Sequence, residues 1–161
     1  MDSSEKLNFS PDNICLTAEC GKNFFCYLER FDLLKDPELL ILSPNGNFYY
    51  DEEELKSVRT FIILKKLNLI KDLDPFLHDI SIIFPPNVNF VGCFSESKVL
   101  KWNVFLSELS TRFFNFLDAR TDNIMDKKVV SKLLQKNSFK VVDMTEIDGL
   151  TFFYSKNGHH P

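Results

Sequence analysis

The feature that most constrains this fold is the excess of phenylalanine over glycine, with 17 Phe and only 5 Gly. Phenylalanine rings bury a large apolar area, so a chain of 161 residues with this composition can build one substantial core. Glycine adopts positive φ angles without steric cost, and loops that cradle phosphates need it. We therefore expect a single domain, residues 1–161, with flexible ends at 1–12 and 156–161 and little material for phosphate loops.

The charged residues are scattered rather than clustered by sign. There are 19 basic and 23 acidic residues, which gives a net charge of −4. Binding to a phosphate backbone requires several converging cations, so we expect no nucleic-acid partner. The acidic run at 51–54 is typical of a first helical turn, where carboxylates complement the positive helix terminus.

The cysteine spacing does not indicate a metal site. Cys15, Cys20 and Cys26 follow a C-x4-C-x5-C pattern, which differs from the C-x2-C pairs of zinc sites, and Cys93 stands alone. We interpret all four as buried free thiols and expect no metal. No segment has the length of a membrane span or the pattern of a signal peptide, so we expect a cytoplasmic protein without a membrane partner.

Hydrophobic periodicity divides the chain into alternating strands and helices. Compact apolar runs predict short strands at 14–16, 39–42, 61–64 and 89–94. Apolar residues at spacings of three and four predict helices at 24–34, 74–84 and 98–117, with a last helix after 126. Two alternating strands, 139–144 and 150–154, are joined by a turn that contains Asp148-Gly149.

Turn and cap residues locate several boundaries in this pattern. Asp74 is expected to cap the N-terminus of a helix with Pro75 in its first turn, and Pro85-Pro86 to end that helix. Asp126 is expected to cap the last helix, with Asn137 in the left-handed position that follows it. Helix-separated strands imply a largely parallel sheet that is covered on both faces, which is the α/β class.

From residue 61 to 157 this order resembles the C-terminal half of class I S-adenosylmethionine-dependent methyltransferases. The apolar strand at 61–64, the helix and turn at 76–87 and the strand at 89–94 match successive elements of that family. The helix after Asp126, the segment Asn137-Ser138-Phe139 and the hairpin are similar to the family's ending. The resemblance implies a reduced Rossmann-like fold, a largely parallel sheet with helices on both faces and a C-terminal antiparallel hairpin.

The cofactor-binding half of that family is reduced in this sequence. The family's first strand ends in an acidic residue and a glycine-rich turn, for which Glu19 and Gly21 are the nearest matches. The strand at 39–42 is followed by Ser43-Pro44, where the family carries a carboxylate for the cofactor's ribose. The resemblance therefore implies that Glu19 and Gly21 are the candidate cofactor residues, and that no cofactor binds unless the protein is active with S-adenosylmethionine.

No Ser-His-Asp spacing, P-loop or metal-binding helix motif is present, so the sequence assigns no catalytic residue. Three functions follow: a degenerate methyltransferase-like protein that acts through protein contacts, an active small methyltransferase with a divergent cofactor loop, or an unrelated α/β binding module. A second apolar patch on the segment 98–117 also predicts a homodimer or another protein partner.

Overall fold

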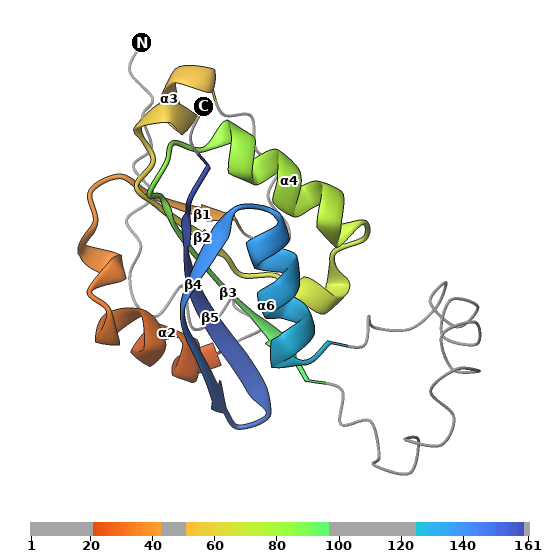
Figure 1. The fold of residues 1–161 in the computed structure, drawn as a ribbon. Coiled ribbons are helices and arrows are strands. Elements are labelled where there is room, and N and C mark those ends of the chain that lie inside the picture. The colour runs from red at the N-terminus through yellow and green to blue at the C-terminus, as the bar shows by residue number, and fades with distance from the viewer. Residues whose placement is uncertain (1–20, 43–50, 97–124, 160–161) are drawn as a thin grey trace, which may run out of the picture.

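A computed structural model describes residues 21–42, 51–96 and 125–159, and within these residues the fold centres on one five-stranded sheet (Figure 1). The strand order is β1-β2-β3-β5-β4. The strands are β1 (Leu39–Leu42), β2 (Thr60–Ile63), β3 (Asn89–Ser95), β4 (Phe139–Ile147) and β5 (Leu150–Asn157).

The sheet combines parallel and antiparallel halves. β1, β2 and β3 pair in parallel, and β5 lies antiparallel between β3 and β4. Helix α3 (Glu52–Ser57) precedes β2, and α4 (Leu73–Ile83) connects β2 to β3. Parallel neighbours require crossover connections of this kind. The prediction of parallel strands followed by a C-terminal antiparallel hairpin is confirmed.

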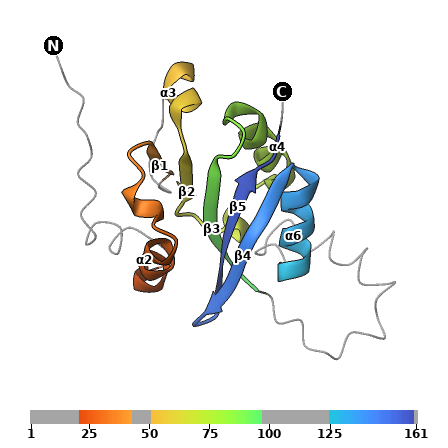
Figure 2. The same ribbon diagram turned by 60° about the vertical axis from the view of Figure 1, so that its left-hand side comes forward.

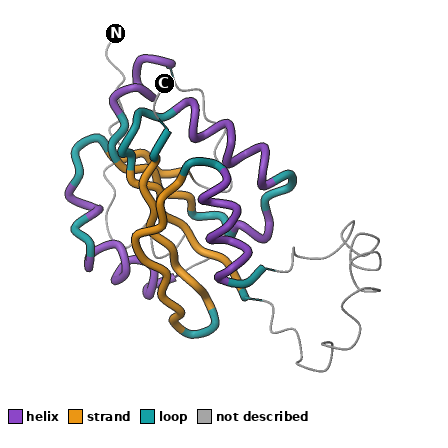
Figure 3. Tube along the Cα trace, viewed as in Figure 1, coloured by secondary structure: helices purple, strands orange, loops and turns teal. Residues whose placement is uncertain are grey.

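Helices cover both faces of the sheet, as Figure 2 shows. Helix α2 (Gly21–Arg30) lies on one face, and α4 and α6 (Lys127–Lys136) lie on the other (Figure 3). Within the described ranges, no helix is long and apolar enough to cross a membrane. Alternation along the strands directs successive side chains into two separate cores.

One core lies beneath α2 and the other beneath α4 and α6. On the α2 side Phe24 and Tyr27 pack on Phe152, with ring centroids 5.4 Å apart in both pairs. On the other side Phe90 contacts Phe139 and Phe153, at 5.2 and 5.1 Å. Phenylalanine rings thus fill the cores on both faces of one sheet. Contacts between paired rings stabilise these cores beyond the burial of apolar area.

Gly92 permits the close packing at the centre of the sheet. A Cβ atom at this position would lie 2.7 Å from Cγ2 of Ile63 and 2.9 Å from the ring of Phe153. Both distances are too short for a carbon contact, so β3 accepts its neighbours only because position 92 has no side chain.

Helix α4 ends where the sequence predicted, at the Pro85-Pro86 pair. Ile83 is its last residue, and a proline pair cannot continue the helical hydrogen bonds. The side-chain amide of Asn157 donates to the carbonyl oxygens of Ser81 and Phe84, at 2.9 and 3.1 Å. The last strand thereby satisfies carbonyl groups that the helix end leaves free.

Two predicted helix ends are placed differently by the structure. Helix α4 begins at Leu73 after Asp72, so Asp74 is in the first turn and does not cap the helix. The Asp74 carboxylate instead accepts a hydrogen bond from the side-chain amide of Asn137 at 2.8 Å. Asp126 caps α6 as predicted, accepting from the Val129 N–H at 2.7 Å. Asn137 has φ −95°, and Ser138 takes the left-handed position with φ 68°.

Other predictions about the chain have mixed outcomes. The predicted strand at 14–16 and helix at 98–117 lie outside the described residues. β5 extends through Asn157, whose side chain is buried, and the flexibility of 156–161 stays a prediction. The interpretation of the cysteines as buried free thiols is wrong for both described positions, because Cys26 is exposed and Cys93 is disulfide-bonded.

Replacing Phe139 by Ala should test the placement of β4. Its ring is 2% exposed and packs on Phe90, so we expect a loss of about 3–5 kcal/mol in the free energy of unfolding. Val142 lies on the same strand and is 48% exposed, so Val142→Ala should change stability by less than about 0.5 kcal/mol. Urea denaturation of both variants gives these values, and equal effects would contradict the placement.

Candidate functional site

The candidate site lies beyond the C-terminal end of α2, where the helix no longer covers the sheet. α2 stops at Arg30, and three neighbouring strand residues at this end of the same face are polar. Thr60, Asn89 and Lys156 lie side by side as a polar row, since Thr60 pairs with Asn89 and Asn89 with Lys156. These residues begin β2 and β3 and lie near the end of antiparallel β5, so the row marks the amino edge of the parallel strands.

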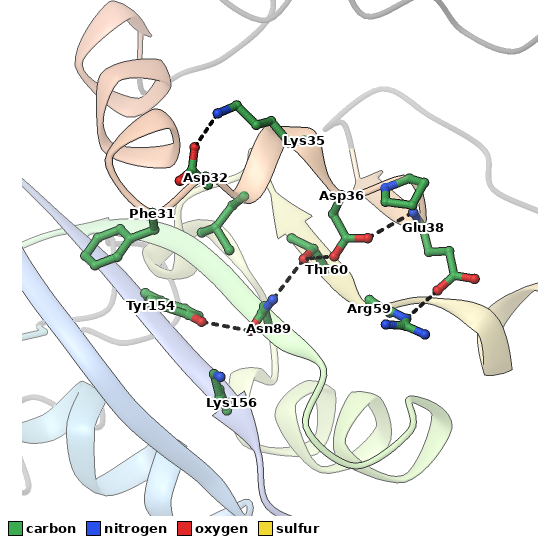
Figure 4. A pocket seen from close by; sticks show the side chains of 12 residues that line it. Phe31, Asp32, Lys35, Asp36, Glu38, Arg59, Thr60, Asn89, Tyr154 and Lys156 are labelled. Carbon is green, nitrogen blue, oxygen red and sulfur yellow. Dashed lines mark hydrogen bonds and ion pairs between the residues drawn. The ribbon is translucent and has the colours of Figure 1, made fainter.

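A pocket of about 580 Å³ opens over this row (Figure 4). Its volume lies within the range of small-molecule sites. The segment after α2 forms one side of the pocket and the polar row forms another. The lining residues are Phe31, Asp32, Leu33, Lys35, Asp36, Pro37, Glu38, Arg59, Thr60, Asn89, Tyr154 and Lys156.

A directed chain of hydrogen bonds fixes the polar side chains of the pocket (Figure 4). The Tyr154 hydroxyl donates to Oδ1 of Asn89 at 2.8 Å, and the Asn89 amide donates to Oγ1 of Thr60 at 3.0 Å. The Thr60 hydroxyl then donates to Oδ2 of Asp36 at 2.8 Å. The other carboxylate oxygen of Asp36 accepts from the Glu38 N–H at 3.0 Å, so the carboxylate is held at both oxygens.

Two ion pairs neutralise most of the charge around the pocket. Lys35 pairs with Asp32, and Arg59 pairs with Glu38, both at 2.7 Å. Asp36 and Lys156 are the remaining charged groups of the lining, and no ion pair of the described residues includes either. Their charges are therefore available to a ligand at two separate points of the pocket.

Aromatic rings form the apolar wall of the pocket. The rings of Phe31 and Tyr154 lie 5.2 Å apart, and Phe31 also contacts Tyr27 at 5.3 Å. Burial raises the pKa of the Tyr154 hydroxyl above its usual value. Tyr154 therefore stays protonated at neutral pH and keeps its role as the donor to Asn89.

The hydroxyl groups of the pocket are held as hydrogen-bond donors. A general base needs a pKa near the working pH, and the burial of Tyr154 moves its pKa further away. The hydroxyl groups of the pocket already donate to fixed acceptors. Among the described residues, no group of three His, Cys, Asp or Glu side chains could hold a metal ion.

A second hollow of about 570 Å³ continues along the same edge of the sheet. It reaches the turn at Pro85-Pro86 and the end of α3 at Lys56 and Ser57. Both hollows share Asp36, Glu38, Arg59, Asn89 and Lys156. Pro85-Pro86 thus lies on the amino edge of the sheet.

At the opposite, carboxyl edge of β2 and β3, side chains of the segment after β2 contact the end of β3. Asn68, in the 3₁₀ helix η2 (Leu67–Leu69), donates to the Ser95 carbonyl at 3.0 Å and accepts from the Ser95 N–H at 2.7 Å. Leu67 is fully buried beside it. The Thr151 hydroxyl donates to Glu96 at 2.7 Å, so this carboxylate is also engaged.

Of the two predicted cofactor residues, the described one, Gly21, does not line the pocket. Glu19 lies outside the described residues, and Gly21 begins α2 with φ 64°. Asn23, in the first turn of α2, donates to Asp148 in the β4–β5 turn at 2.7 Å. This turn lies beside the end of β3, so Gly21 is near the carboxyl edge, where open α/β sheets bind ligands.

Sequence reasoning missed the pocket residues because they stand apart in the chain. The available signal was a polar residue at the first position of two apolar strands, Thr60 and Asn89. A single polar residue at a strand end is common, so the pattern became informative only when the register placed these residues side by side.

Comparison with solved structures gives partial likenesses to methyltransferases. A candidate type 11 methyltransferase from Sulfolobus solfataricus aligns with a TM-score of 0.46 and 16% identity, over 89% of this chain and 85% of that one. A SAM-dependent methyltransferase from Aquifex aeolicus gives 0.45 and 12%, over 80% and 60%. The CMeT domain of the citrinin polyketide synthase gives 0.47 and 16%, over 85% and 36%.

The likenesses concern the fold. This chain spans 30% of the CurJ carbon methyltransferase, another similar structure, with a TM-score of 0.44. No protein-family model matches the sequence, and no curated protein does. The topology of the described residues agrees with the methyltransferase-like fold that the sequence predicted. This assignment rests on the order and direction of the strands, the helix α6 and the closing hairpin, as the sequence predicted.

Alkaline pH should destabilise the protein through Tyr27. Burial, followed by the hydrogen bond to Asp143 at 2.8 Å, raises the pKa of Tyr27 well above its usual value of 10.0. The unfolded chain ionises this tyrosine first, so stability present below about pH 10 is lost as the pH rises further.

We expect Tyr27→Phe to lose less stability than the parent protein between about pH 9 and about pH 11, by up to about 1.4 kcal/mol per pH unit. Urea denaturation across this range measures the two slopes. Identical slopes would mean that Tyr27 ionises in the folded protein as easily as in the unfolded chain.

Proposed function

We propose that this protein uses a methyltransferase-like fold without independent catalysis and acts through protein contacts. The contacts of Asn68 and the burial of Leu67 at the carboxyl edge are the observations that carry the proposal. Asn68 holds both backbone groups of Ser95, and Leu67 fills the space behind it. A cofactor at the ends of β2 and β3 would have to break these contacts. The polar groups of Asn68 and Ser95 would then lose their hydrogen-bond partners, which costs free energy.

The sequence around the other strands supports the same proposal. Ser43-Pro44 follows β1, where the family carries its ribose-binding carboxylate. The chain has only 5 glycines, and Gly21 is the one that matches the family's cofactor turn. Each missing group would normally contribute a polar contact to a buried ligand.

An active methyltransferase is the second candidate, and the position of Gly21 favours it. Gly21 lies at the N-terminus of α2, at the carboxyl edge, with its positive φ and with no atom within 4 Å of an added Cβ. Backbone at such a position can approach a ligand closely. The two candidates differ in one measurable property, which is affinity for the cofactor.

Isothermal titration with S-adenosylmethionine and S-adenosylhomocysteine separates these functions. We expect no saturable binding of either compound, because the carboxyl edge is occupied by Leu67 and Asn68. A methyltransferase of known affinity, titrated in the same buffer, verifies the ligand preparations. Low-micromolar binding of either compound would refute the proposal and support the active enzyme.

We infer that the protein contacts include a homodimer. β4 is an edge strand of the described sheet, and Val142 at its bulge is 48% exposed. The apolar segment 98–117, which also motivates this inference, lies outside the described residues. Size exclusion with light scattering at tens of micromolar protein should give twice the chain mass of 18.8 kDa. A single-chain mass that is independent of concentration would contradict the dimer.

A further inference from the structure

Two lysines lie directly opposite each other at the open end of the hairpin, away from its turn and beside the pocket. Lys140 of β4 pairs in register with Lys156 of β5, and both side chains are exposed. Opposed residues of an antiparallel pair point to the same face, and like charges in this arrangement are destabilising. No ion pair of the described residues includes Lys140 or Lys156. An anion between them would remove the repulsion.

The lysines lie on the face of the sheet that carries the pocket. Tyr154 is two residues from Lys156 on β5, so their side chains share one face. Tyr27 of α2 reaches Asp143 of β4, which shows that this face of the hairpin is the one that α2 covers. The hairpin therefore supplies positive charge to the end of the pocket that is formed by β5.

The other end of the pocket presents a carboxylate. Asp36 is held by the Thr60 hydroxyl and the Glu38 N–H, neither of which is charged. Thr60 is on β2 and Lys156 on β5, with β3 between them. Neighbouring strands lie about 4.8 Å apart, so the two ends are separated by about 10 Å. Asp36 would accept a hydrogen bond from a hydroxyl or amine group.

We propose that the pocket binds a small aromatic carboxylate that carries a hydrogen-bond donor at its far end. The carboxylate lies beside Lys156 and Lys140, and the ring packs on Phe31 and Tyr154. The donor group reaches Asp36. The hydrogen-bond chain from Tyr154 to Asp36 positions the polar groups in advance, which lowers the entropy cost of binding. This ligand site lies at the edge opposite to the cofactor position and does not depend on the function proposed above.

Titration of ¹⁵N-labelled protein with 3-(4-hydroxyphenyl)propanoate tests the site by NMR. We expect saturable shifts of the amides of Thr60, Asn89 and Lys156, with a Kd of millimolar order for a ligand of this size. Tyramine has the same hydroxyphenyl ring but an ammonium group in place of the carboxylate. It should bind at least about tenfold more weakly, because charge-assisted contacts with the lysines are lost.

Two exposed lysines provide a matched pair of variants. Lys156→Gln should weaken binding of the propanoate about tenfold, because the ammonium at the end of the pocket is removed. Lys132→Gln changes the same residue type on α6, on the opposite face of the sheet, and should leave the affinity unchanged. Spectra of both free variants show whether each is folded.

Three results would overturn the proposal. The first is the absence of saturable shifts in the folded protein, and the second is equal or tighter binding of tyramine. The third is saturable binding that differs from the proposal in one of two ways. Either Lys156→Gln leaves its affinity unchanged, or the ligand shifts the amides of Asn68 and Ser95 in place of the pocket residues. The cofactor titration is a separate measurement, so the proposed function is judged by that titration when this proposal fails.

Discussion

The contacts of Asn157 join the last strand to the end of α4, 76 and 73 residues earlier in the sequence. Its side-chain amide donates to carbonyl oxygens at the end of α4, and its backbone exchanges hydrogen bonds with Asn87 and Val88, at 2.7 and 2.9 Å. Pro85-Pro86 ends α4 and leaves carbonyl groups there without helical partners. Because Asn157 satisfies some of them, the last strand is bound to the end of α4 as well as to β3.

The placement of β5 explains why the two edges of the sheet differ. Its antiparallel direction brings Tyr154 and Lys156 to the starts of β2 and β3, beside Thr60 and Asn89. α2 is too short to cover this row, so the polar groups remain accessible in a pocket. At the opposite edge the chain turns inward after β2 and buries Leu67. Among the described residues, the pocket therefore lies at the amino edge, whereas the side chain of Asn68 binds the end of β3 at the carboxyl edge.

Sequence patterns predicted most described elements because those elements depend on local chemistry. Pro85-Pro86, the Asp126 cap and the Asp148-Gly149 turn each act within a few residues, and each lies where it was expected. Asp74 was misassigned because its partner, Asn137, is distant in sequence and bonds it only after α4 and α6 pack together. The pocket could not be predicted for the same reason, since its row exists only through the pairing of three strands.

The central claim is that ligands reach this protein at the amino edge of its parallel strands. An NMR screen of a chemically diverse fragment library, read out on every assigned backbone amide, tests this claim without assuming a ligand. Binding fragments should shift Thr60, Asn89 and Lys156 and leave Gly21, Asn68 and Ser95 unchanged. Hits that gather at Gly21, Asn68 and Ser95 would contradict the account, because the carboxyl edge would then be the functional one.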